Sequence, residues 1–424
     1  MSDDKQTKNY KNKNDKKKEL DASKEVISES EITTYQSQEQ AVRDEANTEQ
    51  SIDNAANKEA SFDQPLENAN PVENPEADTS KKKSKINYYK IFYILCTIGF
   101  FVFTALFVND LFVQPYLTNR SLAKIDALYT KPSLIPTPYP TAVATDPVAT
   151  PTVIPVTVEI SPTPDPPRDD KGRLLQFSEL LNENEDVKGW ITIPDSNMDL
   201  VVMQSDYSYP EYYLTKDIYR NYLKAGSLFL DKNSSVENGT QNLVIHGHNM
   251  TSTDNMFHYL IYFKELDYYR ERPVFTFDTI LKTGQWKIFS IFITNGTSKE
   301  EALFDYTKAT FTDSSDFLNF VYQLRIRSLF QIDNVDINEN DELLTLSTCS
   351  YEVKDYRTVI VARKIREGEA PSVDVDSVTM IETPLYPYSW YYQYGGKAPP
   401  KLAPTFEEAL EAGDINWYTP VTEE

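Results

Sequence analysis

An uncharged apolar run over residues 91–108 constrains the architecture of this chain more than any other feature. It reads IFYILCTIGFFVFTALFV and contains no Asp, Glu, Lys or Arg. At 1.5 Å per residue, about 20 apolar residues in a helix cross the hydrocarbon core of a bilayer. We therefore expect a single transmembrane helix within residues 86–113, with water-exposed segments on both sides.

The charges around this run predict its orientation. Five lysines precede it: Lys81, Lys82, Lys83, Lys85 and Lys90. Asn109 and Asp110 follow it. Because basic residues stay on the cytoplasmic side, we expect a cytoplasmic N-terminus and an extracellular C-terminal part. A cleavable signal peptide is the competing interpretation, but such peptides begin at the N-terminus and this run lies behind a long polar segment.

The composition changes along the chain and suggests the remaining divisions. Residues 1–85 are polar and charged, which predicts a disordered cytoplasmic tail. Residues 114–172 are expected to form a Pro/Thr-rich extracellular stalk that holds the next domain away from the membrane. Residues 173–367 have a globular composition, and residues 368–424 form a Tyr/Pro-rich extension to which the sequence assigns no role.

The net charge of −23 argues against one class of partner. Binding to nucleic acid phosphates requires a basic face, so no nucleic acid partner is expected. The acidity is better understood as a contribution to solubility.

Short β-rich stretches dominate the globular part and predict its fold. They occupy residues 189–193, 199–203, 226–230, 241–246, 274–278, 286–294, 343–349 and 358–364. Helical spacing is expected at 174–183, 256–262 and 313–324. Many short strands with few helices favour a mainly β fold, a closed barrel, over a doubly wound sheet.

The chain has two cysteines, Cys96 in the apolar run and Cys349 far downstream. They are expected in different phases, so a disulfide between them is implausible. A lone thiol outside the cell suggests a reactive role or intermolecular pairing.

Cys349 ends one expected strand, LLTLSTC, and Arg357 begins the next, RTVIVARKI. If the two strands pair antiparallel, Cys349 lies beside Arg357. A neighbouring cation favours the nucleophilic thiolate, and a guanidinium can also hold a developing oxyanion. The competing interpretation is that Cys349 is a small buried hydrophobic residue.

Two of the three histidines lie in NLVIHGHNM, at His246 and His248. Acyl transfer through a cysteine needs a group that protonates the leaving amine, and histidine suits this near neutral pH. A zinc site is the alternative, but no third and fourth ligand has the usual spacing. We therefore expect no metal and no cofactor. For His258, on the expected helix, a role in the core or at the surface is the default.

Three segments together resemble the active-site set of sortases: TLSTC (345–349), RTVIVA with Arg357, and GHNM (247–250). The helix-containing segment 317–349 is similar to that of class B. The resemblance covers about residues 173–367. The chain departs from the pattern at His246, where Tyr is usual, and at Ser350, where an acidic residue is common; Glu352 is a candidate substitute.

The resemblance implies an eight-stranded sortase-type β-barrel with an N-terminal helix and a helical insertion before the cysteine strand. It implies a membrane-anchored cysteine transpeptidase of Gram-positive bacteria that cleaves a Thr–Gly-type bond in a C-terminal sorting signal. Cys349 would be the nucleophile, His248 the acid/base, Arg357 the transition-state stabiliser and Ser347 a substrate contact. The partners would be surface proteins with sorting signals and an amine of peptidoglycan or a pilin.

Two alternatives remain at this point. The chain could be a cysteine peptidase that only hydrolyses its acyl intermediate, or a non-catalytic wall-associated binding module. The sequence gives neither the sorting-signal motif nor the amine acceptor.

Overall fold

The computed structural model describes residues 88–131, 165–206, 208–251, 254–296, 304–397 and 401–421. The chain divides into two units, Met1–Ile86 and Asn87–Glu424, and every described residue belongs to the second. The expected cytoplasmic tail, and residues 132–164 of the expected stalk, lie outside the described residues.

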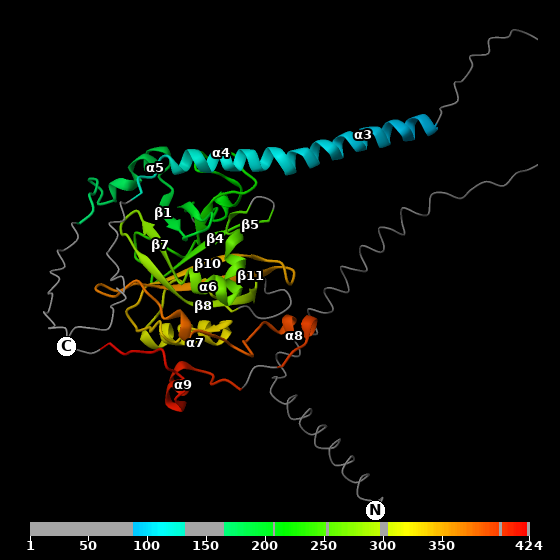
Figure 1. Cartoon of the computed structure of the whole chain (residues 1–424). Helices are drawn as coiled ribbons and strands as arrows, with labels where there is room; N and C mark the ends of the chain where they lie inside the picture. Colours follow the sequence, from blue (N-terminus) through cyan, green and yellow to red (C-terminus); the bar gives the residue numbers. More distant parts are fainter. Residues whose placement is uncertain are drawn as a thin grey trace, which may run out of the picture. The chain divides into compact units, whose positions relative to one another are not determined.

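Eight strands close into a barrel in the order β1-β2-β3-β4-β10-β11-β8-β7 (Figure 1). The bounds are β1 Val187–Thr192, β2 Asp199–Met203, β3 Leu228–Leu230, β4 Asn242–Gly247, β7 Val274–Thr279, β8 Gln285–Asn295, β10 Leu343–Ser350 and β11 Tyr356–Lys364. Each overlaps one of the eight expected strands, so the closed-barrel prediction is confirmed. The interior is filled by aliphatic and aromatic side chains from these strands, whose burial is the main driving force for closing the barrel.

The barrel brings together strands that are far apart in the sequence. β10 pairs antiparallel with β11, and Cys349 lies opposite Arg357, as expected from the sequence. On its other edge β10 pairs in parallel with β4, which places Ser347 opposite His246. A parallel neighbour needs a crossover connection, and here the chain between β4 and β10 includes β7, β8 and two α-helices.

Two expected helices are confirmed. The first is α5, Ser178–Glu183, preceded by the 3₁₀ turn η2, Leu175–Phe177. The second is α7, Ser314–Arg327, which Asp313 caps by accepting a hydrogen bond from the Asp316 backbone N–H.

The helix expected at 256–262 is instead a 3₁₀ helix, η4, His258–Lys264, followed by the short α-helix α6, Leu266–Glu271. Phe257, Leu260 and Phe263 are fully buried along this stretch. They recur every three residues, and a 3₁₀ helix stacks residues i and i+3 on one face. Burial of that stripe explains the tighter helix.

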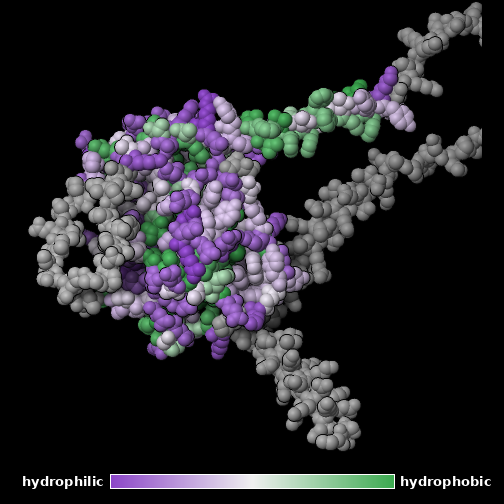
Figure 2. Space-filling view, viewed as in Figure 1, coloured by the Kyte–Doolittle hydropathy of each residue, from purple (hydrophilic) through white to green (hydrophobic). Residues whose placement is uncertain are grey.

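The apolar run forms α3, Tyr88–Val108, in which no residue is buried. It continues through the π-helical turn η1, Asn109–Val113, into α4, Gln114–Asp126. In the described part of the chain, one helix, Tyr88–Asp126, has the length and the apolar composition needed to cross a membrane. Figure 2 shows its hydrophobic surface, which distinguishes it from the mostly hydrophilic exterior of the barrel.

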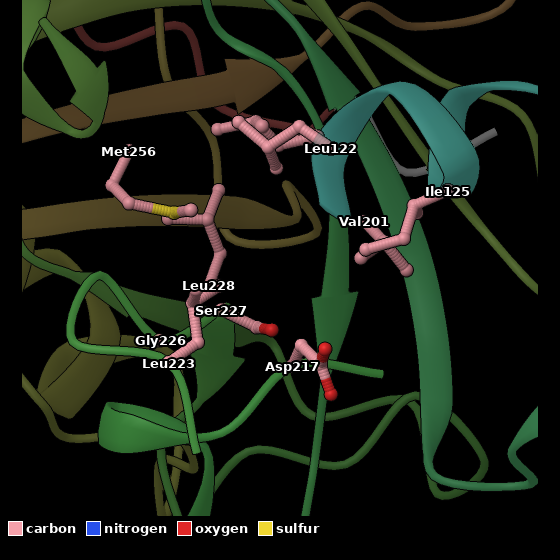
Figure 3. A pocket seen from close by; sticks show the side chains of 10 residues that line it. Leu122, Ile125, Val201, Asp217, Leu223, Gly226, Ser227, Leu228 and Met256 are labelled. Carbon is pink, nitrogen blue, oxygen red and sulfur yellow. The ribbon is translucent and has the colours of Figure 1, made fainter. Parts of the chain in front are cut away.

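Residues 114–131 differ from the stalk expected there. The α4 helix packs on the barrel, with Leu122 and Ile125 near Val201 of β2 (Figure 3). Just beyond it, Tyr129 is buried and stacks on Trp190 of β1, with ring centroids 4.3 Å apart. Leu122, Ile125 and Tyr129 recur at the spacing of one helix face, so the sequence carries a helical signal here. The Trp190 surface that receives Tyr129 is formed only by the folded barrel.

The C-terminal extension is also part of the folded unit. Strand β12, Thr379–Met380, pairs with β9, Phe330–Gln331, in a separate two-stranded sheet. Helix α9, Phe406–Ala412, packs on α7, and Phe406 joins the hydrophobic core (Figure 1). These contacts make the extension part of the same folded unit as the barrel.

Arg363, at the far end of β11 from Arg357, is fully buried. Its Nη1 lies 2.6 Å from Glu369 Oε2, just beyond the expected domain boundary at residue 367. Because an unpaired buried guanidinium is strongly destabilising, residues after 367 contribute to the stability of the barrel.

Candidate active site

A groove lies where the ends of β4, β10 and β11 meet. Its lining includes Cys349, His248, Arg357 and Ser347, the four residues singled out in the sequence. The other lining residues are Pro210, Glu211, Leu214, Phe229, Asp231, Lys232, His246, Gly247, Gly296, Tyr306 and Thr348. The cavity drawn in Figure 3 is a different one, beneath α4, and contains none of the four.

Cys349 is half-buried in the last part of β10, directly across the hairpin from Arg357. The Arg357 Nη1 donates hydrogen bonds to the carbonyl oxygens of Tyr356, at 3.1 Å, and Asp355, at 3.4 Å. Gly296, after β8, approaches the guanidinium so closely that a Cβ there would lie 2.9 Å from Arg357 Cζ. The site therefore holds a thiol and a fixed cation at one strand end, which suits nucleophilic attack with stabilisation of an oxyanion.

His248 follows the last residue of β4 and is half-buried. Its Nε2 donates to the Leu214 carbonyl oxygen at 3.0 Å, because a carbonyl oxygen can only accept. Burial lowers the pKa of His248 below its ordinary value, although the bond to Leu214 opposes this shift. A half-buried imidazole with one nitrogen fixed in this way can exchange a proton near neutral pH.

His246 has a different partner in the same groove. Its Nε2 lies 3.2 Å from Asp231 Oδ2, and its ring is 5.5 Å from that of Phe229. Burial acts to raise the pKa of Asp231, but the hydrogen bonds from His246 and the Asn233 backbone outweigh it, and the pKa is lowered. His246 is thus engaged by a carboxylate, whereas His248 is held by a backbone carbonyl.

Ser347 is buried in β10 and its hydroxyl lies 3.0 Å from the Tyr306 hydroxyl. Tyr306 follows β8 and also lines the groove, and burial raises its pKa. No motif in the sequence pointed to Tyr306 or to Leu214. Both come from connecting segments whose position only the folded barrel defines.

Asn249, which lies within the GHNM segment, has a supporting role in the structure. Its Nδ2 donates to the Cys349 carbonyl oxygen at 3.0 Å. Its Oδ1 lies 2.7 Å from Nδ1 of His258, which is buried outside the groove and so has a role in the core rather than at the surface.

Glu352, the candidate substitute for an acidic residue after the cysteine, is half-buried. Its carboxylate bonds with the Lys264 ammonium and the Ser350 hydroxyl. Burial acts to raise the pKa of Glu352, but these two bonds outweigh it, and the pKa is lowered. Glu352 does not line the groove, so the structure gives it a part in shaping the β10–β11 connection.

The described residues include no group of three or more His, Cys, Asp and Glu side chains placed to hold a metal ion. His246 and His248, the pair that raised the possibility of zinc, direct Nε2 to different partners, Asp231 and Leu214.

The chain matches the sortase domain family over residues 191–365. Sortase B of Listeria monocytogenes is 30% identical over 181 residues, which cover 43% of this chain and 69% of that protein. The chain belongs to the sortase family. Sortase B of Staphylococcus aureus is 28% identical over 193 residues, covering 45% of this chain and 75% of its own length.

The expected class B resemblance is confirmed by these two relatives, and this sortase is a cysteine transpeptidase enzyme. Solved structures of similar proteins include Clostridium perfringens sortase B, 30% identical with a TM-score of 0.41, covering 45% of this chain and 99% of that one. Bacillus anthracis sortase B is 21% identical with a TM-score of 0.45, covering 60% and 100%. The sortase match ends at residue 365 and leaves out the C-terminal extension.

Proposed function

We propose that this sortase cleaves a C-terminal sorting signal, forms a thioacyl enzyme on Cys349 and transfers the acyl group to an amine of peptidoglycan or a pilin. The observation that carries the proposal is the convergence of Cys349, His248 and Arg357 on one groove from the ends of three strands. The family membership supplies the reaction class, and the groove supplies a nucleophile, an acid/base and a cation.

In the first half-reaction the Cys349 thiolate attacks the carbonyl carbon of the scissile bond, and the carbonyl oxygen becomes an oxyanion. Arg357 is proposed to stabilise that oxyanion, a contribution for which one donor is typically worth about 10²–10³ in rate. The protonated His248 then donates its proton to the leaving amine as the C–N bond breaks. The products are a thioester on Cys349, a free amine and a neutral imidazole.

In the second half-reaction an acceptor amine attacks the thioester and loses a proton to the neutral His248. The C–S bond breaks, an amide forms, and the Cys349 thiolate and the His248 imidazolium are restored. Ser347, whose hydroxyl is held by Tyr306 on the groove wall, is proposed to contact the substrate.

To test this function, peptides that contain a Thr–Gly bond are incubated with the full chain in detergent, and the masses of the products are measured. With an added amine such as triglycine, we expect a transpeptidation product. Without it, slow hydrolysis at the same bond should appear because water resolves the thioester. Hydrolysis alone, at a rate that triglycine does not change, would identify a peptidase instead. No cleavage across a broad panel of Thr–Gly peptides would count against the proposed substrate class.

We also propose that Tyr88–Val108 anchors the enzyme in the cell membrane as a single span, with the N-terminus in the cytoplasm and the barrel outside. The support is the length of this apolar helix, in which no residue is buried, and the lysines that precede it. Protease added to wall-stripped intact cells is expected to degrade the part after Asp110 and to spare residues 1–85, as detected with terminal tags. Loss of an N-terminal tag under those conditions would reverse the orientation.

A further inference from the structure

The C-terminal extension contacts the connection between the cysteine strand and the arginine strand. Helix α8, Tyr388–Tyr394, contributes Trp390, whose ring is stacked on Tyr356 with centroids 6.4 Å apart and planes at 24°. The other stacked neighbour of Trp390 is Tyr386, at 4.5 Å and 14°. Tyr356 is the first residue of β11 and is only 2% exposed. The indole therefore forms part of the packing around the residue that immediately precedes Arg357.

Hydrogen bonds from α8 reach the same connection. The Tyr394 hydroxyl donates to the Glu352 carbonyl oxygen, and the Tyr356 and Ser389 hydroxyls are bonded to each other. On its other side Glu352 is bonded through its carboxylate to Lys264 and Ser350. The connection 351–355 is therefore held between α8 and the barrel.

This connection in turn holds Arg357. The Asp355 and Tyr356 carbonyl oxygens accept from the Arg357 guanidinium, and the Asp355 carbonyl also accepts from the Gly296 backbone N–H at 2.8 Å. Asp355 has a left-handed φ of +62°, which an Asp residue adopts only at some cost, so the connection benefits from outside support. A shift of these carbonyls would move the guanidinium.

We infer that α8 of the C-terminal extension is a positioning element of this enzyme, and that Trp390 acts through Tyr356 to fix the orientation of Arg357. The extension lies outside the residues that match the sortase domain. The inference rests on the proposed role of Arg357 in the groove. Trp390 itself does not line the groove.

The first test is steady-state kinetics of the full chain on a Thr–Gly peptide that the wild-type enzyme cleaves. Trp390→Ala should lower kcat about tenfold or more, because small displacements of a group that acts in the transition state cost rate. KM should change less than about twofold, since the groove is otherwise unaltered. Tyr394→Phe, which removes only the hydroxyl that bonds to Glu352, should also lower kcat, but by a smaller factor than Trp390→Ala.

Two variants control for general damage. Trp390→Phe retains a stacking ring and should recover most of kcat. Tyr392→Ala, on the same helix with an 87% exposed side chain, should match the wild type. Backbone hydrogen exchange over residues 351–357 should accelerate in Trp390→Ala and remain unchanged in Tyr392→Ala.

The outcomes separate this inference from the proposed function. Unchanged kcat in Trp390→Ala, or unchanged hydrogen exchange over 351–357, overturns the inference while leaving the transpeptidase intact. A kcat loss that Trp390→Phe does not recover, with exchange raised throughout the barrel, also overturns it, because the effect would then be general destabilisation. Peptide cleavage that persists in Cys349→Ala would contradict the proposed function, whereas the hydrogen exchange would still report on the support of the connection.

Discussion

Cys349→Ala is expected to lose all measurable turnover, a drop of at least about 10⁴-fold, because the thiolate is the group that forms the covalent intermediate. The variant should also form no thioacyl adduct when a Thr–Gly peptide is added and the protein is analysed by intact mass. Alanine removes only the sulfur from a half-buried position between β4 and β11, so the barrel should retain its thermal unfolding midpoint within a few degrees.

The second cysteine gives a matched control. Cys96 lies in α3, far along the chain from the groove and exposed on the apolar helix. Cys96→Ser removes a thiol of the same type and should retain wild-type turnover. If Cys96→Ser lost activity and Cys349→Ala kept it, the groove would not be the site of the chemistry.

His248→Ala is expected to lower the rate of acyl transfer by about 10²–10⁴, the range in which positioned acid/base groups contribute. The Leu214 carbonyl fixes this ring in the groove, and removal of the imidazole leaves no group at that position to protonate the leaving amine. The rate is measured with the same Thr–Gly peptide and a fixed amine concentration.

His246→Tyr is the paired variant and should keep most of the activity. The His246 ring is engaged by Asp231, and a tyrosine hydroxyl can donate to the same carboxylate. His246 and His248 lie at the same end of one strand and line the same groove. Comparing the two variants therefore separates the loss of the acid/base group from the general effect of replacing a histidine in this groove. Near wild-type rates for His248→Ala, with a large loss for His246→Tyr, would assign the role to the other histidine.

The sequence alone determined the positions of the barrel strands and the pairing of Cys349 with Arg357 across the hairpin. Each strand carries its own β-rich composition, and a hairpin with a short connection places the last residue of one strand beside the first of the next. The eight expected strands and this register are therefore found in the structure nearly as the local pattern predicts. The class B resemblance rested on the same local motifs and is confirmed by the relatives.

Only the tertiary structure decided the contacts between segments that are far apart in the sequence. Three of these contacts join residues about 34 or more positions apart: Leu214 with His248, Tyr306 with Ser347, and Trp390 with Tyr356. Such pairs leave no periodic signal, because each partner is a single residue in a connection whose path is defined by the closed barrel. The packing of α4 and of the C-terminal extension was also decided by the tertiary structure. Their apolar side chains become buried only once the barrel and α7 offer a surface to pack against.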